Sequence, residues 1–81
     1  MDRPADIARI VKFHRKKAGL SQQELAKLAG IGKTAVFDLE KGKETIQLDT
    51  LKKVLYVLNI KMTFDSPLMK DFEAEAIDEE G

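Results

Sequence analysis

The most constraining feature of this sequence is a series of small and apolar residues in its middle. Ala26, Gly30, Val36 and Leu39 follow one another at intervals of four, six and three residues. Ala26 lets two helices cross closely, and Gly30 makes a sharp turn between them. Val36 and Leu39 anchor the second helix so that its other face stays outside. The spacing therefore predicts two short helices held at a fixed angle, with one helical face left free.

Local signals set the ends of these two helices. Ser21 and Glu24 have the capping-box spacing, in which each side chain satisfies a backbone N–H at the start of a helix. The first helix of the pair is therefore expected to begin at Ser21 and to end at Gly30. The second is expected over residues 32–41, with Gly42 as its stop.

Helical periodicity also predicts one helix before this pair and one after it. The earlier helix is expected over residues 4–19, with a face formed by Ile7, Ile10, Val11, His14 and Ala18. The later helix is expected over residues 48–59, with an apolar stripe formed by Leu48, Leu51, Val54, Leu55, Val57 and Leu58.

Two short helices with a free outer face make the helix-turn-helix pattern. The stretch LSQQELAKLAGIGKTAVFDLEKGKETIQLDTLKKVL resembles the Cro and phage-repressor class, also called xenobiotic-response-element regulators, over about residues 7–58. With LNIKMTF and SPL after it, the chain is most similar to the HipB-like antitoxins, which repress their own operon and bind HipA-like kinase toxins. The resemblance implies an all-α, lambda-repressor-like bundle of four to five helices. The alternative is a helical bundle that never touches nucleic acid.

Polar side chains cover the predicted outer face of the third helix, where they can reach base edges or phosphates in a major groove. The resemblance places Lys33 and Thr34 at positions directed into the groove, and Gln22 at one that braces against phosphate. Asp38 can accept from cytosine but repels phosphate, so we expect it to discriminate between sequences. The expected DNA-contacting residues are Gln22, Gln23, Lys33, Thr34, Phe37, Asp38, Lys41 and Lys43.

Phe37 is the informative member of this set. An apolar ring on an exposed helical face needs cover, which a thymine methyl group or a sugar edge can supply. The alternative is that Phe37 packs on a neighbouring helix. Lys41 and Lys43 are expected to attract the DNA backbone without reading its sequence.

Residues 59–67, NIKMTFDSP, alternate apolar and polar side chains, which is the period of a strand. No second segment has this period, and a lone strand leaves its backbone N–H and C=O groups without partners. We therefore expect residues 60–65 to pair with a second copy across a two-fold axis, as the HipB-like resemblance also implies. The residues expected at this homodimer contact are Val57, Ile60, Met62, Thr63 and Phe64. A dimer with two reading helices predicts a palindromic operator in double-stranded DNA.

The formal net charge of zero hides an asymmetry along the chain. Residues 1–64 carry 13 Lys and Arg against 7 Asp and Glu, a net +6, whereas residues 65–81 carry 1 against 7, a net −6. The chain thus divides into a DNA-binding domain with its dimerising strand (1–64) and an acidic C-terminal tail (65–81). We expect a short helix over 67–73 and an unstructured end over 75–81. We expect an amphipathic patch that docks either on the dimer body or on a toxin, formed by Leu68, Met69 and Phe72.

Two positions depart from the family pattern. His14 stands where the family usually has an arginine that pairs with a glutamate corresponding to Glu40. We expect slightly greater stability when His14 is protonated against Glu40, the alternative being an ordinary histidine at the edge of the core. Ile46 replaces a frequent proline before the fourth helix, so a less rigid loop is expected there.

The residue inventory argues against several classes of protein. With one histidine, no cysteine and no phosphate-cradling glycine loop, the chain offers no acid–base pair, nucleophile or metal set. We therefore expect no enzyme, no metal and no cofactor. The lack of a long apolar run or signal-like N-terminus favours a cytoplasmic, nucleoid-associated protein with no membrane partner. Two further hypotheses stay open: a free-standing repressor without a toxin, and a protein-interaction adaptor that does not bind DNA.

Overall fold

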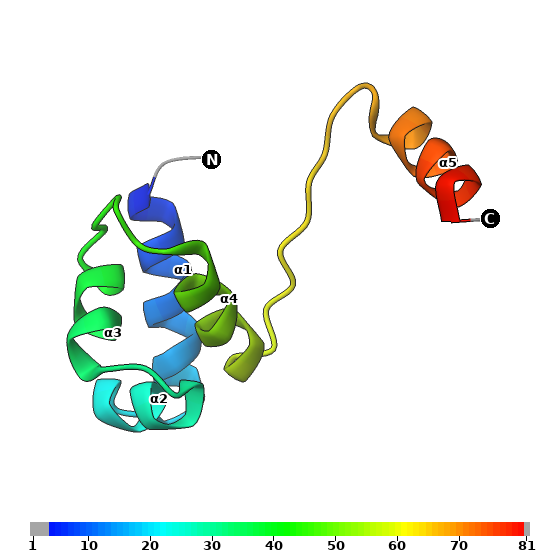
Figure 1. Ribbon diagram of the computed structural model, residues 1–81. Coiled ribbons are helices and arrows are strands. Elements are labelled where there is room, and N and C mark those ends of the chain that lie inside the picture. The colour runs from blue at the N-terminus through cyan, green and yellow to red at the C-terminus, as the bar shows by residue number, and fades with distance from the viewer. Residues whose placement is uncertain (1–3, 81) are drawn as a thin grey trace.

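Each of the first four helices supplies one fully buried apolar side chain to a common core. The computed structural model describes the backbone of residues 4–80 and the side chains of residues 6–76. Over this range its helices are α1 (Pro4–Lys17), α2 (Gln22–Ala29), α3 (Lys33–Glu40), α4 (Leu48–Val57) and α5 (Met69–Glu80) (Figure 1). The four fully buried side chains are Val11, Leu25, Val36 and Val54. The all-α architecture predicted from the sequence is confirmed.

The first four helices form one bundle in which α3 holds a central place. α3 packs against α1 and α2, and α4 packs against α2 and α3. On α3 the inward side chains are Val36 and Leu39, both buried, as the spacing predicted. On the other side of α3 the side chains of Lys33, Thr34 and Phe37 are exposed.

The ends of α2 have the predicted geometry. The Ser21 hydroxyl accepts the Glu24 N–H at 3.0 Å, and the Glu24 carboxylate accepts the Ser21 N–H at 2.7 Å. The hydrogen bonds from the Ser21 backbone and then from its hydroxyl lower the pKa of Glu24. At the other end Gly30 adopts a left-handed φ of 71°. A side chain would meet nothing within 4 Å there, so the glycine serves the conformation of the turn rather than a close approach.

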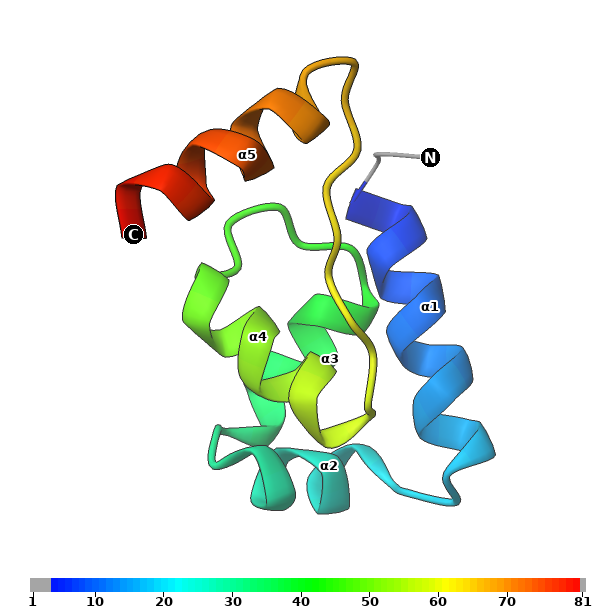
Figure 2. The same ribbon diagram turned by 90° about the vertical axis from the view of Figure 1, so that its right-hand side faces the viewer.

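The chain leaves the bundle through a left-handed residue at the end of α4. Asn59 has φ 59°, and the next N–H, that of Ile60, donates to the Leu55 carbonyl at 2.9 Å. Residues 60–66 then run without helical structure to α5, which Figures 1 and 2 both show apart from the bundle. This projecting part gives the molecule its elongated dimensions of 43 × 25 × 24 Å.

The strand predicted over residues 60–65 is not formed in the single chain, because none of residues 4–80 is in a β-strand. The physical reason is that a strand needs a hydrogen-bonded ladder, and the expected partner is a second copy of the same segment. In the single chain Met62 is 39% exposed and Phe64 is 75% exposed, while Ile60 packs against the core. The pairing across a dimer stays a prediction.

The C-terminal helix is longer than the sequence predicted. The structure continues α5 to Glu80, whereas an unstructured end was expected from residue 75. Glu and Ala are strong helix formers, and the segment FEAEAIDEE is rich in both, so local propensity outweighs the acidic composition. Gly81 lies outside the described residues. Across residues 4–80 no helix combines the length and the apolar character needed to cross a membrane.

Candidate nucleic-acid interface

The outer face of α3 is exposed as the sequence predicted. Lys33 and Thr34 occupy its first turn, and both side chains are exposed. Phe37 follows at 46% exposure, and the Lys41 ammonium lies 5.0 Å from the centre of its ring. Phe37 is thus about half covered in the single chain, and its contact with DNA stays a prediction. A cation over the ring covers part of its apolar face and places a positive charge beside it.

Asp38 and Lys43 are brought together at the end of α3. The Lys43 ammonium lies 3.5 Å from an Asp38 carboxylate oxygen, and the Lys43 N–H donates to the Asp38 carbonyl at 3.0 Å. The two charges compensate each other in part. The repulsion that Asp38 exerts on a phosphate is therefore weaker than the sequence alone suggests, and so is the attraction from Lys43.

The two glutamines at the start of α2 have different surroundings. The Gln22 side-chain N–H donates to the Glu40 carboxylate at 3.1 Å and the residue is half-buried, whereas Gln23 is exposed. Gln22 therefore joins α2 to α3. One amide N–H and the carbonyl oxygen of its side chain are not used in this contact.

The strongest polar contact of the bundle is one that the sequence analysis missed. Arg15 on α1 donates from Nε to Glu40 Oε2 at 2.6 Å, from Nη2 to Glu40 Oε1 at 3.0 Å and from Nη1 to the Leu20 carbonyl at 2.8 Å. The side chains of Arg15 and Glu40 are only 10% and 3% exposed. This bidentate pair fixes the C-terminal end of α3 against α1.

The predicted pairing of His14 with Glu40 is therefore wrong. His14 is exposed, and its Nδ1 lies 2.7 Å from the Ile10 carbonyl one turn earlier. The buried face of α1 contains Ala8, Val11 and Arg15. Their spacing of three and four residues is helical, which makes Arg15 a candidate for this face alongside His14.

The ion pair changes the titration of its carboxylate. Burial alone raises the pKa of Glu40, but hydrogen bonds from Arg15 and Gln22 and the positive charges of Arg15 and Lys12 outweigh it. The net effect holds the pKa of Glu40 below its ordinary value of 4.5. The hydrogen bond with Glu40 also raises the pKa of Arg15.

We expect a pH dependence of stability from this shift. A carboxyl whose pKa is lowered on folding stabilises the fold above its unfolded pKa, and this contribution is lost as the pH falls through the folded value. In urea unfolding, the stability difference between the wild type and Glu40→Gln should be largest near neutral pH and shrink below pH 4.5. The exposed Glu44→Gln is the matched control. A difference that stays constant from neutral pH into strong acid contradicts this expectation.

The residues expected at the dimer and tail contacts are only partly brought together. Val57 and Ile60 are half-buried against the core, and Met62, Thr63 and Phe64 are exposed. On the tail, Leu68 is 69% exposed, Phe72 is 64% exposed and Met69 is half-buried. Most of the apolar side chains that the sequence assigned to these contacts are therefore uncovered in the single chain.

A capped short helix, a left-handed glycine turn and a second helix with a free polar face define a helix-turn-helix protein. The family model described as HTH_3: Helix-turn-helix matches residues 11–64, so this chain belongs to that family of regulators. An uncharacterized HTH-type transcriptional regulator, y4mF of Sinorhizobium fredii (strain NBRC 101917 / NGR234), is 41% identical over 64 residues, covering 79% of this chain and 84% of the relative. Antitoxin HipB of Escherichia coli (strain K12) is 33% identical over 60 residues, covering 74% and 68% respectively.

Two solved structures of HipB resemble the fold closely. A HipB-O4 20mer complex matches with a TM-score of 0.75 and 30% identity, covering 83% of this chain and 94% of the other. A HipA-HipB-O2-O3 complex matches with the same TM-score, identity and coverage. The resemblance to HipB-like antitoxins stated from the sequence is confirmed.

Proposed function

We propose that this protein is a sequence-specific transcriptional repressor that binds double-stranded DNA as a homodimer. The observation that carries the proposal is the outer face of α3, where Lys33, Thr34, Phe37 and Lys41 are exposed while Val36 and Leu39 are buried on the other side. A helix held this way can enter a major groove with its first turn leading. The HipB-O4 20mer complex, with the same fold, supports this reading.

The contacts can be divided by role. Lys33 donates to guanine O6 or N7, and Thr34 hydrogen bonds or offers its methyl group to thymine. Phe37 packs on a thymine methyl or a sugar edge, and Lys41 over its ring is close enough to reach phosphate. Gln23 and Lys43, with the unused amide groups of Gln22, complete the phosphate contacts, which set register without reading sequence. Asp38 tunes the preference between sequences from within its ion pair.

The partner proposed for this repressor is a HipA-like kinase toxin encoded in the same operon. The repressor binds this toxin and also represses transcription of the operon. Support comes from the similarity to HipB antitoxins and from the HipA-HipB-O2-O3 complex. The second candidate is a free-standing repressor, which agrees with the 41% identity to y4mF, an uncharacterized HTH-type transcriptional regulator. Copurification of a kinase-like product of the adjacent gene distinguishes the two.

We expect Lys33→Ala combined with Thr34→Ala to weaken operator binding at least about 1,000-fold, since the dimer loses four base contacts and each is worth about 1 kcal/mol or more. The slope of log affinity against log salt should change by less than about 1, because base contacts dominate the loss. The measurement is a gel-shift titration with DNA selected from a random pool by the wild type. Lys52→Ala with Thr50→Ala removes the same residue types from α4 and should leave binding unchanged.

The outcome separates the repressor from the protein-interaction adaptor. Equal binding of DNA by the two double variants argues against the proposed reading helix. A wild-type protein that selects no DNA from the pool argues for the adaptor. Circular dichroism of both variants checks that the bundle is intact. Lys33, Thr34 and Lys52 are exposed and Thr50 is half-buried, so we expect both variants to keep their helix content.

A further inference from the structure

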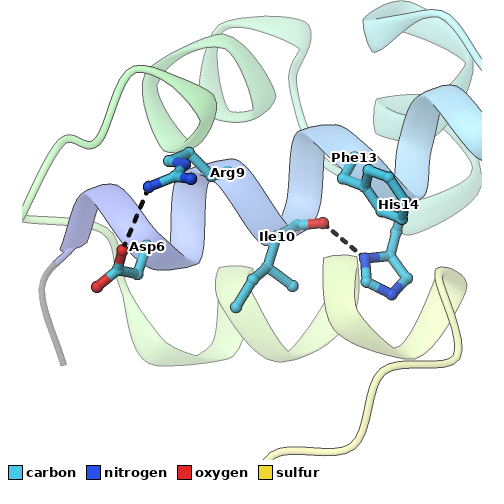
Figure 3. A pocket seen from close by; sticks show the side chains of 5 residues that line it. All are labelled: Asp6, Arg9, Ile10, Phe13 and His14. Carbon is cyan, nitrogen blue, oxygen red and sulfur yellow. Dashed lines mark hydrogen bonds and ion pairs between the residues drawn. The ribbon is translucent and has the colours of Figure 1, made fainter. Parts of the chain in front are cut away.

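The outer face of α1 carries a shallow depression that none of the proposed DNA-contacting residues lines. Its volume is about 420 Å³, and it is lined by Asp6, Arg9, Ile10, Phe13 and His14 (Figure 3). Phe13 is 57% exposed, and the Lys17 ammonium lies 5.6 Å from its ring. The face is thus apolar in its middle, with the cations of Arg9 and Lys17 on successive turns at either side of Phe13.

The helix α5 has the complementary character and has no place on its own bundle. Leu68 and Phe72 lie one turn apart and are 69% and 64% exposed. The sequence of α5 carries six acidic residues and one lysine, a net −5. Apart from Arg15, whose charge is paired with Glu40, α1 carries four Lys and Arg and one Asp, a net +3. Two uncovered apolar faces with opposite charge favour contact with each other. We infer that α5 docks on the outer face of α1 of the second copy in the homodimer.

The direction of the extended segment explains why the contact joins two copies. This step rests on the proposed dimer. An extended stretch of six residues spans about 20 Å, so residues 60–65 carry α5 away from its own bundle. In antiparallel pairing the partner's segment runs the opposite way, so its far end arrives near Asn59 and Ile60 of the first copy. Figures 2 and 3 show that this end of the segment starts near the C-terminal half of α1.

The other depressions on the bundle are less suitable for α5. One is lined by Tyr56, Val57, Asn59, Ile60 and Lys61, and a second by Leu28, Ala29, Lys52, Lys53, Tyr56 and Val57. Both include Val57, and the first also includes Ile60, residues expected at the contact between the paired segments. The dimer itself therefore covers this area. The α1 face lies outside it and remains available to the partner's α5.

Cysteine cross-linking tests the contact in the full-length protein, because the chain has no cysteine of its own. Phe13→Cys protein is mixed with Phe72→Cys protein and equilibrated in a glutathione redox buffer. The matched control replaces Phe72→Cys by Lys70→Cys, which lies on the opposite face of α5. We expect the mixed disulfide dimer to form about tenfold faster with Phe72→Cys than with Lys70→Cys, since exchange depends on access between the two thiols. High salt should reduce this preference because it screens the opposite charges.

Each result decides the inference. If the disulfide forms at the same rate with Phe72→Cys and with Lys70→Cys, the docking is overturned. If sedimentation velocity still shows a dimer in that case, the proposed repressor is unaffected. A monomer in sedimentation overturns both the dimer and the docking in trans. The double variant Phe13→Cys with Phe72→Cys distinguishes the copies: a disulfide within one chain overturns the trans arrangement, and a cross-linked dimer supports it. Wild-type melting behaviour of each reduced variant shows that the fold is retained.

Discussion

Replacing Arg15 with methionine is expected to lower the free energy of unfolding by about 3–5 kcal/mol, the cost of leaving a buried charge without its partner. Glu40, with a side chain only 3% exposed, would keep one hydrogen bond, from Gln22. A loss of this size is a large part of the about 5–15 kcal/mol that stabilises a typical domain. Urea unfolding at a fixed protein concentration measures it, since self-association would otherwise contribute to the result.

Two further variants identify the cause of the loss. Arg9→Met makes the same substitution on the same helix, but the Arg9 side chain is 84% exposed and its guanidinium lies 3.8 Å from Asp6, so we expect a change below about 0.5 kcal/mol. Adding Glu40→Leu to Arg15→Met should recover much of the stability, because replacing both members of a buried pair is often neutral. If Arg15→Met lowers the free energy of unfolding no more than Arg9→Met does, the ion pair does not stabilise the bundle.

Replacing Met62 and Phe64 together with glutamine is expected to weaken self-association about a thousandfold. The two-fold axis makes each substitution count twice, so four apolar side chains at about 1 kcal/mol each amount to about 4 kcal/mol. Operator affinity should fall with it, because a monomer presents one reading helix instead of two. Sedimentation equilibrium and gel-shift titration measure the two effects. Both side chains are exposed in the single chain, so helix content should not change.

The alternation along the segment supplies the control for this experiment. Lys61→Gln with Asp65→Gln introduces the same residue at two positions of the opposite face and leaves the net charge unchanged. We expect this variant to dimerise like the wild type. If the two double variants weaken self-association equally, the segment does not pair as a strand with one apolar face. If neither variant weakens self-association, the dimer contact lies elsewhere.

The helices could be predicted because their determinants are local. The capping box of Ser21 and Glu24 and the turn at Gly30 act within a few residues of chain, and the structure reproduces both. Helical spacing likewise identified Val36 and Leu39 as the inward residues of α3. Such features depend on backbone hydrogen bonds and side-chain periodicity, which the sequence displays directly.

The buried ion pair could not be assigned to the right residue by the same means. His14 and Arg15 are neighbours on α1, about 100° apart around the helix, and both lie at the border of the apolar face. Which of them meets Glu40 depends on the angle at which α1 crosses α3, a property of the packed bundle. The structure selects Arg15 and leaves His14 at the surface.

The C-terminal part could be predicted less fully for two other reasons. Pairing of residues 60–65 needs a second chain, so no property of one sequence copy can complete it. For α5, two rules conflict: acidic composition predicts disorder, whereas Glu and Ala favour helix. Propensity prevails as far as Glu80 in the structure.

The Arg15–Glu40–Gln22 contact has a consequence for how relatives of this protein diversify. It ties α1, α2 and α3 together from the inner side of the bundle, so the orientation of α3 does not depend on the side chains that point outward from it. Lys33, Thr34 and Phe37 are thus free to mutate with little loss of stability. Under the proposed function, a lineage can acquire a new operator by a few exposed substitutions while keeping the same scaffold.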